Sequence, residues 1–427
     1  SRIANTPPDL TAQEIWVNIR LLPLLAQELV IKKILLRGSS IKVTRNSEGK
    51  FEFAGLNGIL IRKNKLEENF FKSIKLGLVP QLVIQNGRVQ FFDYYNNPDP
   101  TTVLLANLNA SIKKLITAPT FSFIFRGEVV NEYRESSFSI SGKLQDPSGG
   151  FDFRHLSIDG HISAEDIEFD TIRPYIKYSD ALDSSPLAIS TNSDFSWGLD
   201  RRLNLSGDFK YHPIVKQKEP SLQSSINSRQ GKLDYKIQWA NEILDIKEAS
   251  FQSGDIQLNG SGQIREVSST DPKISFFLKS SDLPVKRLGG YTPFKKIPES
   301  VELIRKKLGM GYVKIESLNF DGTLSQLNQL EKNSNLGMLS GEIELRKVNW
   351  DLPFVKLRKI GGTFKFNEGR GDIRIEKARC KGLPNVMLTG TILNVINRPR
   401  GDLKLEGSLP LKDMKEILVQ KYSDPSF

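Results

Sequence analysis

The chain has 427 residues, of which 38% are hydrophobic and 26% are charged. The low apolar content disfavours a thick globular core, and the single cysteine, Cys380, excludes an intrachain disulfide and a zinc cluster. The formal net charge of +11 suits either a solvated surface or an anionic partner. Because the basic residues are scattered and form no basic tail, the pattern favours an anionic membrane surface over nucleic acid as that partner.

No apolar stretch approaches the roughly 20 residues that span a bilayer. The sequence also lacks the pattern of a signal peptide. The chain begins abruptly at Ser1 and ends abruptly at Phe427, so we interpret it as a mature form or a piece of a longer protein.

The first elements lie between Leu10 and Phe53. Alternation of apolar and polar residues predicts strands, and Pro23 near the start of a short apolar run suits a helix. The expected elements are a strand at 12–20, a helix at 21–26, and strands at 28–37, 41–45 and 50–53. The sequence therefore predicts a strand, a short helix and then a meander.

The next segments are less regular. Residues 65–75 have helical spacing and predict a short amphipathic lid or connector. Residues 79–93 predict a β-hairpin, because Asn86-Gly87 is a two-residue turn signal between alternating residues. Beyond residue 103 the pattern is almost all strand, apart from an expected helix at 298–308 and a polar loop at 325–335.

Two repeats indicate a modular β architecture. One is a five-residue unit of the form apolar, any, apolar, small or polar, glycine, found at 138–142, 203–207, 256–260, 386–390 and 403–407. The other is a strand followed by a short helix, and its copies begin near 11, 164, 281 and 407. We expect three modules, 1–178, 179–290 and 291–427, in a mainly antiparallel all-β fold with few short helices. The predicted form is one elongated curved sheet with an apolar groove.

A search for catalytic and ligand-binding motifs argues against an enzyme. His155, His161 and His212 lack the cysteine or carboxylate spacing of a metal site. No nucleophile elbow, phosphate-binding glycine loop or zinc-protease motif occurs. The phenylalanines are not interleaved with arginine, as a single-strand nucleic-acid module would require. We therefore expect no enzyme activity, no metal, no cofactor and no nucleic-acid partner.

Apolar residues at every second position form the main binding candidate. They could pack together as the core of a closed sandwich, or they could line an open groove that holds acyl chains; the low hydrophobicity and the few helices favour the groove. The candidate groove residues are Phe121, Phe123, Phe125, Phe138, Ile140, Ile256, Leu258, Ile274, Phe276, Leu278, Phe364, Phe366, Ile373, Ile375, Leu403 and Leu405.

The opening segments resemble the amino-terminal region of the bacterial AsmA-like family. The resemblance rests on the apolar helix at 21–25, the strand and hairpin at 29–51 and the segment at 83–93. It covers roughly the first 180 residues, and the later modules look like the repeating β-groove of larger family members. The resemblance implies an inner-membrane anchor, which this chain lacks, and a periplasmic β-groove that moves phospholipid toward the outer membrane.

Two hypotheses follow for function. The first is a periplasmic protein that carries phospholipid acyl chains in its groove, with Leu21, Leu22, Leu24 and Leu25 as a plug at one end. The alternative is a non-enzymatic envelope scaffold that binds other proteins by pairing with its edge strands. A third option, carbohydrate binding, would need exposed Trp platforms, and the four Trp residues are far apart in the sequence.

Overall fold

The computed structural model of the chain describes most of the expected strands. The described residues are 10–25, 30–49, 51–53, 81–95, 100–114, 120–130, 135–145, 156–172, 187–214, 230–287, 308–329, 337–351, 356–380, 383–393 and 400–407. The helix expected at 65–75, the strand–helix repeat after 407 and the helix expected at 298–308, except Leu308, lie outside them.

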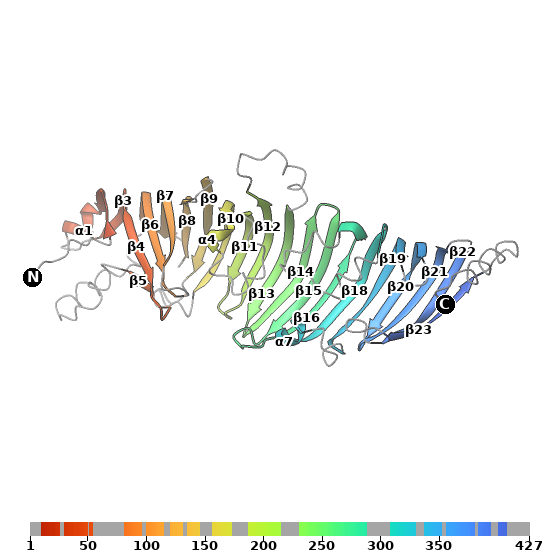
Figure 1. Ribbon diagram of the computed structural model, residues 1–427. Coiled ribbons are helices and arrows are strands. Elements are labelled where there is room, and N and C mark those ends of the chain that lie inside the picture. The colour runs from red at the N-terminus through yellow and green to blue at the C-terminus, as the bar shows by residue number, and fades with distance from the viewer. Residues whose placement is uncertain are drawn as a thin grey trace, which may run out of the picture. The chain divides into compact units, whose positions relative to one another are not determined.

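The chain divides into two units. Unit 1 comprises Ser1–Ser179 and Ser184–Lys218, and unit 2 comprises Asp180–Asp183 and Glu219–Phe427. The described part of each unit is nearly all β, with a mostly antiparallel open sheet and few short helices (Figure 1). This confirms the predicted fold class, and the three-module division stays a prediction.

In unit 1 the sheet runs from β2 through β3 and β6 to β12, each strand pairing with the next. Strand β6 pairs in parallel with both β3 and β4, and every other ladder is antiparallel. The elements are β1 (Leu10–Thr11), β2 (Glu14–Ile19), α1 (Leu21–Leu25), β3 (Ile31–Arg37), β4 (Ser40–Arg45), β5 (Phe51–Phe53), β6 (Gln81–Asp93), β7 (Thr101–Lys114), β8 (Thr120–Val130), β9 (Glu135–Gln145), β10 (Ser157–Glu168), α4 (Phe169–Ile172), β11 (Leu187–Trp197) and β12 (Leu203–Pro213).

The strand, helix and meander expected at the start of the chain are confirmed. Elements β2, α1, β3, β4 and β5 fall within two or three residues of their predicted bounds. The turn at 46–49 closes with a hydrogen bond from the Gly49 amide to the Asn46 carbonyl. Local alternation and turn chemistry were sufficient here because each element contrasts clearly with the next.

The hairpin expected at 79–93 is wrong. Residues Gln81–Asp93 form the single strand β6, and Asn86-Gly87 is a bulge at which β6 changes its parallel partner from β3 to β4. Asn86 takes the left-handed φ that a turn also needs (51°), and its amide donates to the Asn109 side chain. The chain does not reverse because β7 pairs with β6 on both sides of the bulge.

In unit 2 the sheet runs from β13 to β16 and from β18 to β23, and β16 and β17 follow one another along one edge of β18. All of its ladders are antiparallel. The elements are β13 (Gly231–Ala240), β14 (Ile243–Ser253), β15 (Ile256–Arg265), β16 (Lys273–Ser280), β17 (Asp282–Pro284), η6 (Val285–Arg287), β18 (Tyr312–Thr323), α7 (Leu324–Leu327), β19 (Leu339–Asp351), β20 (Lys356–Asn367), β21 (Arg370–Cys380), β22 (Leu383–Leu393) and β23 (Arg400–Gly407).

The strand–helix repeat is present at each described copy. α1 follows β2, α4 follows β10, and the short 3-10 helix η6 follows β17. A further short helix, α7, occupies the start of the segment expected as a polar loop. Thr323 and Gln326 form a capping box at its N-terminus, a Thr-x-x-Gln signal that was readable in the sequence.

The glycine of the five-residue unit allows neighbouring side chains to approach closely. A Cβ at Gly142 would lie 2.8 Å from Cζ of Phe123, and a Cβ at Gly390 would lie 2.9 Å from Cδ2 of Leu403. At these two positions the glycine therefore leaves the space that a large apolar side chain on the adjacent strand fills, whereas a Cβ at Gly207 would meet Asn192 and Ser193.

Candidate functional site: two apolar sheet faces

Strand register decides which side chains share a face, because residues directly opposite one another in a ladder point to the same side. In unit 1, Phe123 lies opposite Ile112 on one side and Gly142 on the other. Continued through successive ladders, this row crosses the sheet from β2 to β12. Its members are Val17, Ile34, Leu82, Ile112, Phe123, Gly142, Gly160, Phe195 and Leu205.

All candidate groove residues of unit 1 belong to this face. Phe121, Phe123 and Phe125 lie opposite Leu144, Gly142 and Ile140, and Phe138 lies opposite Gly127. Phe121 is buried, at 6% exposure. The other four candidates are half-buried.

Unit 2 has an equivalent face. Phe366 lies opposite Gly341 and Gly371, and its row crosses the sheet from β13 to β23. The members of this row are Tyr235, Ala249, Gly260, Leu278, Leu318, Gly341, Phe366, Gly371, Ile392 and Gly401. The rows beside it place the remaining candidates of unit 2 on the same face, namely Ile256, Leu258, Ile274, Phe276, Phe364, Ile373, Ile375, Leu403 and Leu405.

Exposure varies along the face of unit 2. Ile256, Ile373 and Ile375 are buried at 5% or less. The last two belong to a core cluster with Val285, Val313, Leu345, Val348, Leu357, Ile360, Ala378, Val386 and Leu388. Leu403 and Leu405 on β23 are 45% and 47% exposed. The buried members contact protein, and the half-buried and exposed members form the surface that a ligand can reach.

Aromatic pairs recur along both faces. Ring centroids lie 6.0 Å apart for Phe123 and Phe125, and 5.7 Å apart for Phe364 and Phe366. Phe276 stacks on Phe320 of the neighbouring strand, with centroids 5.5 Å apart. A hollow of about 680 Å³ over β14–β19 includes Phe276 and Phe320 in its lining.

The described residues place no second sheet on either face. Within each unit, the strands in close contact are neighbours in a ladder, and the main contacts of α4 and α7 are with strands next to them in sequence. This differs from a sandwich, in which strands of two sheets pack face to face. Among the described residues, therefore, neither a facing sheet nor a helical layer covers the apolar face of either unit.

No family model, curated protein or solved structure matches this chain.

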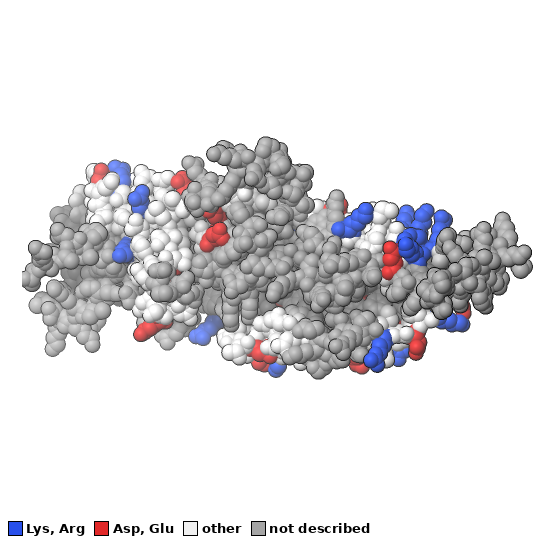
Figure 2. All heavy atoms as spheres, in the orientation of Figure 1, with Lys and Arg blue, Asp and Glu red and all other residues white. Residues whose placement is uncertain are grey.

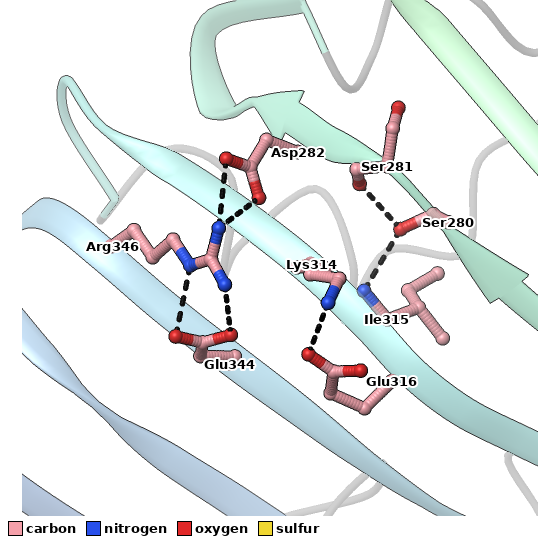
Figure 3. Close-up of polar contacts among 8 residues, drawn as sticks. All are labelled: Ser280, Ser281, Asp282, Lys314, Ile315, Glu316, Glu344 and Arg346. Atoms are coloured by element: carbon pink, nitrogen blue, oxygen red, sulfur yellow. Dashed lines mark hydrogen bonds and ion pairs between the residues drawn. The ribbon is translucent and has the colours of Figure 1, made fainter.

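The opposite face of each sheet is polar, and ion pairs stabilise it. Arg346 on β19 lies between Asp282 of β17 and Glu344, with Nη1 3.0 Å from Asp282 Oδ1 and Nη2 2.7 Å from Glu344 Oε2 (Figure 3). The hydrogen bonds from Arg346 lower the pKa of Glu344, and the carboxylate in turn raises the pKa of Arg346. This network connects β17 to β19, the strands on either side of β18, where β16 gives way to β17.

Two of the four leucines expected as an end plug are well exposed, and the plug stays a prediction. Leu21 and Leu22 of α1 are 75% and 81% exposed, and the side chains of Leu24 and Leu25 lie outside the described residues. Beside them on β2, an edge strand among the described residues, the exposed apolar side chains are those of Ile15, Trp16 and Val17. We call these five exposed side chains the β2–α1 patch.

The structure pairs two histidines with carboxylates that sequence spacing did not indicate. His161 Nδ1 lies 2.8 Å from Asp194 Oδ1, and His212 Nε2 lies 3.4 Å from Asp166 Oδ1. His155 lies outside the described residues. Among the described side chains, no three metal-ligating groups gather, and no described helix is long and apolar enough to cross a membrane.

Proposed function

We propose that this chain binds lipid acyl chains on its apolar sheet faces and transfers phospholipid between the inner and outer membranes. One observation carries the proposal: within each unit, register assigns every candidate groove residue to one face, and no described sheet packs against it. Leaving apolar surface in water costs about 25 cal/mol per Å². Acyl chains match such a face because they are apolar and pack without hydrogen bonds.

The periplasmic location and the inner-membrane anchor in a longer form of the protein rest on the resemblance to the AsmA-like family. Contact with a membrane has separate support. The β2–α1 patch combines Trp16 with exposed leucines, and Arg20 and Lys32 beside it are also exposed. Exposed Trp and Leu flanked by basic residues suit the interface of a bilayer.

The experiment measures lipid bound to the purified chain by native mass spectrometry and solvent extraction. We expect phospholipid to co-purify with the wild type and to be largely lost from Phe123→Glu, Phe276→Glu and Leu405→Glu. Leu405 is already 47% exposed, so the carboxylate that Leu405→Glu introduces stays solvated and the fold is retained. Matched controls on the polar face of the same or a nearby strand, Ser122→Glu and Lys279→Glu, should keep their lipid.

A folded wild-type chain without bound lipid would overturn the proposal. Equal lipid loss in the polar-face controls would also overturn it. Circular dichroism spectra and thermal unfolding establish that each variant is folded.

The envelope scaffold is the second candidate, and strand β23 favours it. All eight of its residues are exposed, and β23 pairs only with β22 among the described strands. A strand with a free edge can accept an added strand from a partner. If Phe123→Glu and Leu405→Glu abolish lipid binding but leave envelope integrity unchanged in cells, the scaffold is the better account.

A further inference from the structure

Three adjacent strands of unit 2 have shifts in pairing register that lie side by side across the sheet, and each shift contains a lysine. Strand β19 shifts register between Arg346 and Val348, β20 between Arg358 and Gly361, and β21 between Ile375 and Ala378. The lysines are Lys347, Lys359 and Lys377, and all three are exposed. We call them the lysine row.

The backbone of two of these lysines is strained. Lys347 and Lys359 have φ angles of 54° and 53°, which side chains other than glycine rarely adopt. The Lys359 amide donates to Asn349 Oδ1 at 3.1 Å, which helps to hold this conformation. Strain of this kind in a bulge is a feature of sites that re-aim a side chain.

The sequence neighbours of the lysine row are buried in the core cluster. Val348 and Ile360, each adjacent in sequence to a lysine of the row, are fully buried, and Ala378, next to Lys377, is 3% exposed. These residues belong to the core cluster that also includes Ile373 and Ile375. The lysines are therefore positioned by packed neighbours.

The positive charges of the lysine row have no ion-pair partners among the described residues. Arg358 lies directly opposite Arg379, an arrangement of like charges that destabilises a ladder. Asp351 pairs with Arg358 and Glu376 with Arg374, whereas the lysine row makes no ion pair with the described residues. Figure 2 shows Lys and Arg side chains gathered in the part of unit 2 that holds β20 and β21.

We propose that the lysine row binds the phosphate headgroups of anionic phospholipid at a membrane surface. This inference rests on the proposed lipid function and adds the lipid's charge and the place where the headgroup binds. Ammonium groups bind phosphate as point charges, and several of them side by side give affinity for an anionic bilayer. Strand β20 also carries the candidate groove residues Phe364 and Phe366, and β21 carries Ile373 and Ile375, so headgroup and acyl-chain sites occur on the same strands.

The test compares vesicles of phosphatidylcholine with vesicles that also contain phosphatidylglycerol, by co-sedimentation at low and physiological ionic strength. The variants are Lys347→Gly, Lys359→Gly and Lys377→Gln. We expect each to weaken binding to anionic vesicles about fivefold, with no change for neutral vesicles. The two glycine variants should also melt at a higher temperature, because glycine accepts the left-handed φ without strain.

Arg201→Gly is the matched control, since it also removes a positive charge from a left-handed residue (φ 57°) in a turn of unit 1. It should melt higher but bind anionic vesicles as the wild type does. Unchanged binding in the lysine variants, or an equal loss in the Arg201 variant, would overturn the inference. Displacement of the bound vesicles by a poly-glutamate peptide, or by inorganic phosphate at equal charge concentration, would also overturn the inference.

The lipid content of the same variants separates this inference from the proposed function. If vesicle binding is unchanged while phospholipid still co-purifies, the lysine row is wrong and the groove proposal stands. If no lipid co-purifies but anionic vesicles bind through the row, the groove proposal is wrong and the row remains a membrane-docking surface.

Discussion

At the residue scale, the polar face depends on side chains that join strands where backbone pairing is interrupted. Between β16 and β17, the Ser280 hydroxyl accepts a hydrogen bond from the Ile315 amide of β18 at 2.8 Å (Figure 3). Arg346 then bonds Asp282 on β17 and Glu344 on β19. The Ser280 contact satisfies a backbone amide that a continuous ladder would otherwise pair, and the Arg346 contacts join the two strands through side chains.

The Arg346 network predicts a pH dependence of stability. Hydrogen bonding to Arg346 lowers the pKa of Glu344 from its ordinary value of 4.5. The stabilisation is therefore complete above pH 4.5 and is lost as the pH falls through the lower pKa of the folded state. We expect Glu344→Gln to lower the melting temperature at neutral pH by about 1–2 °C, because both partners are partly exposed.

Thermal unfolding followed from neutral pH to below pH 4.5 checks this expectation. The difference between Glu344→Gln and the wild type should shrink on acidification. Glu248→Gln is the control, because Glu248 is an exposed carboxylate whose ion pair among the described residues is with Lys236. A difference that stays constant with pH would contradict the assigned role of Glu344.

At the element scale, the strands are shaped by glycines that leave room for large side chains on the neighbouring strand. A Cβ at Gly142 would overlap the Asp159 carbonyl oxygen and the ring of Phe123. We expect Gly142→Ala to destabilise unit 1 by about 1–3 kcal/mol, the usual effect of overpacking. Denaturant unfolding measures the change.

Two further variants make the glycine prediction specific. Phe123→Leu in the Gly142→Ala background should recover part of the lost stability, because it removes the ring but not the clash with the backbone oxygen. Gly337→Ala should be close to neutral, since a Cβ there meets no atom within 4 Å. Equal destabilisation by Gly142→Ala and Gly337→Ala would show that overlap at Gly142 is not responsible.

Element prediction succeeded where the signal was local and failed where pairing decided the outcome. Helix α1 and strands β2 to β5 were predicted from signals a few residues long. These are alternation within the strands, Pro23 in the helix and the turn at 46–49 between β4 and β5. Strand β6 was mistaken for a hairpin because Asn86-Gly87 suits a bulge as well as a turn. Only pairing with β3, β4 and β7 selects the bulge.

At the scale of the whole molecule, both units follow the same plan of one apolar and one polar face. The β2–α1 patch of unit 1 departs from it, since Trp16 and Ile15 on opposite faces of β2 are both more than 60% exposed. Exposed apolar side chains in one segment are what the proposed contact with a membrane requires. The patch and the lysine row differ in chemistry, so vesicle composition separates their contributions.

We expect Trp16→Ser and Leu22→Ser each to weaken binding to neutral phosphatidylcholine vesicles about tenfold, since each removes one large apolar side chain from the interface. Leu199→Ser is the control, because Leu199 is also well exposed (55%) but lies outside the patch. Co-sedimentation measures the binding. Equal weakening by Leu199→Ser would mean that the patch has no special role.

The sequence by itself determined the fold class and the side of each strand on which the apolar residues lie. Both follow from a period of two, which is a property of neighbouring residues in one strand. The strand–helix repeat and the apolar candidates were readable for the same reason.

Only the tertiary structure decided which residues from different strands meet. Lys347, Lys359 and Lys377 share one level, and His161 lies beside Asp194, because strand register and bulges align them. Register depends on pairing between distant segments and on the packing of Val348 and Ile360 beneath it. No local pattern contains that information, since shifting one strand by a single bulge moves its side chains relative to every neighbour.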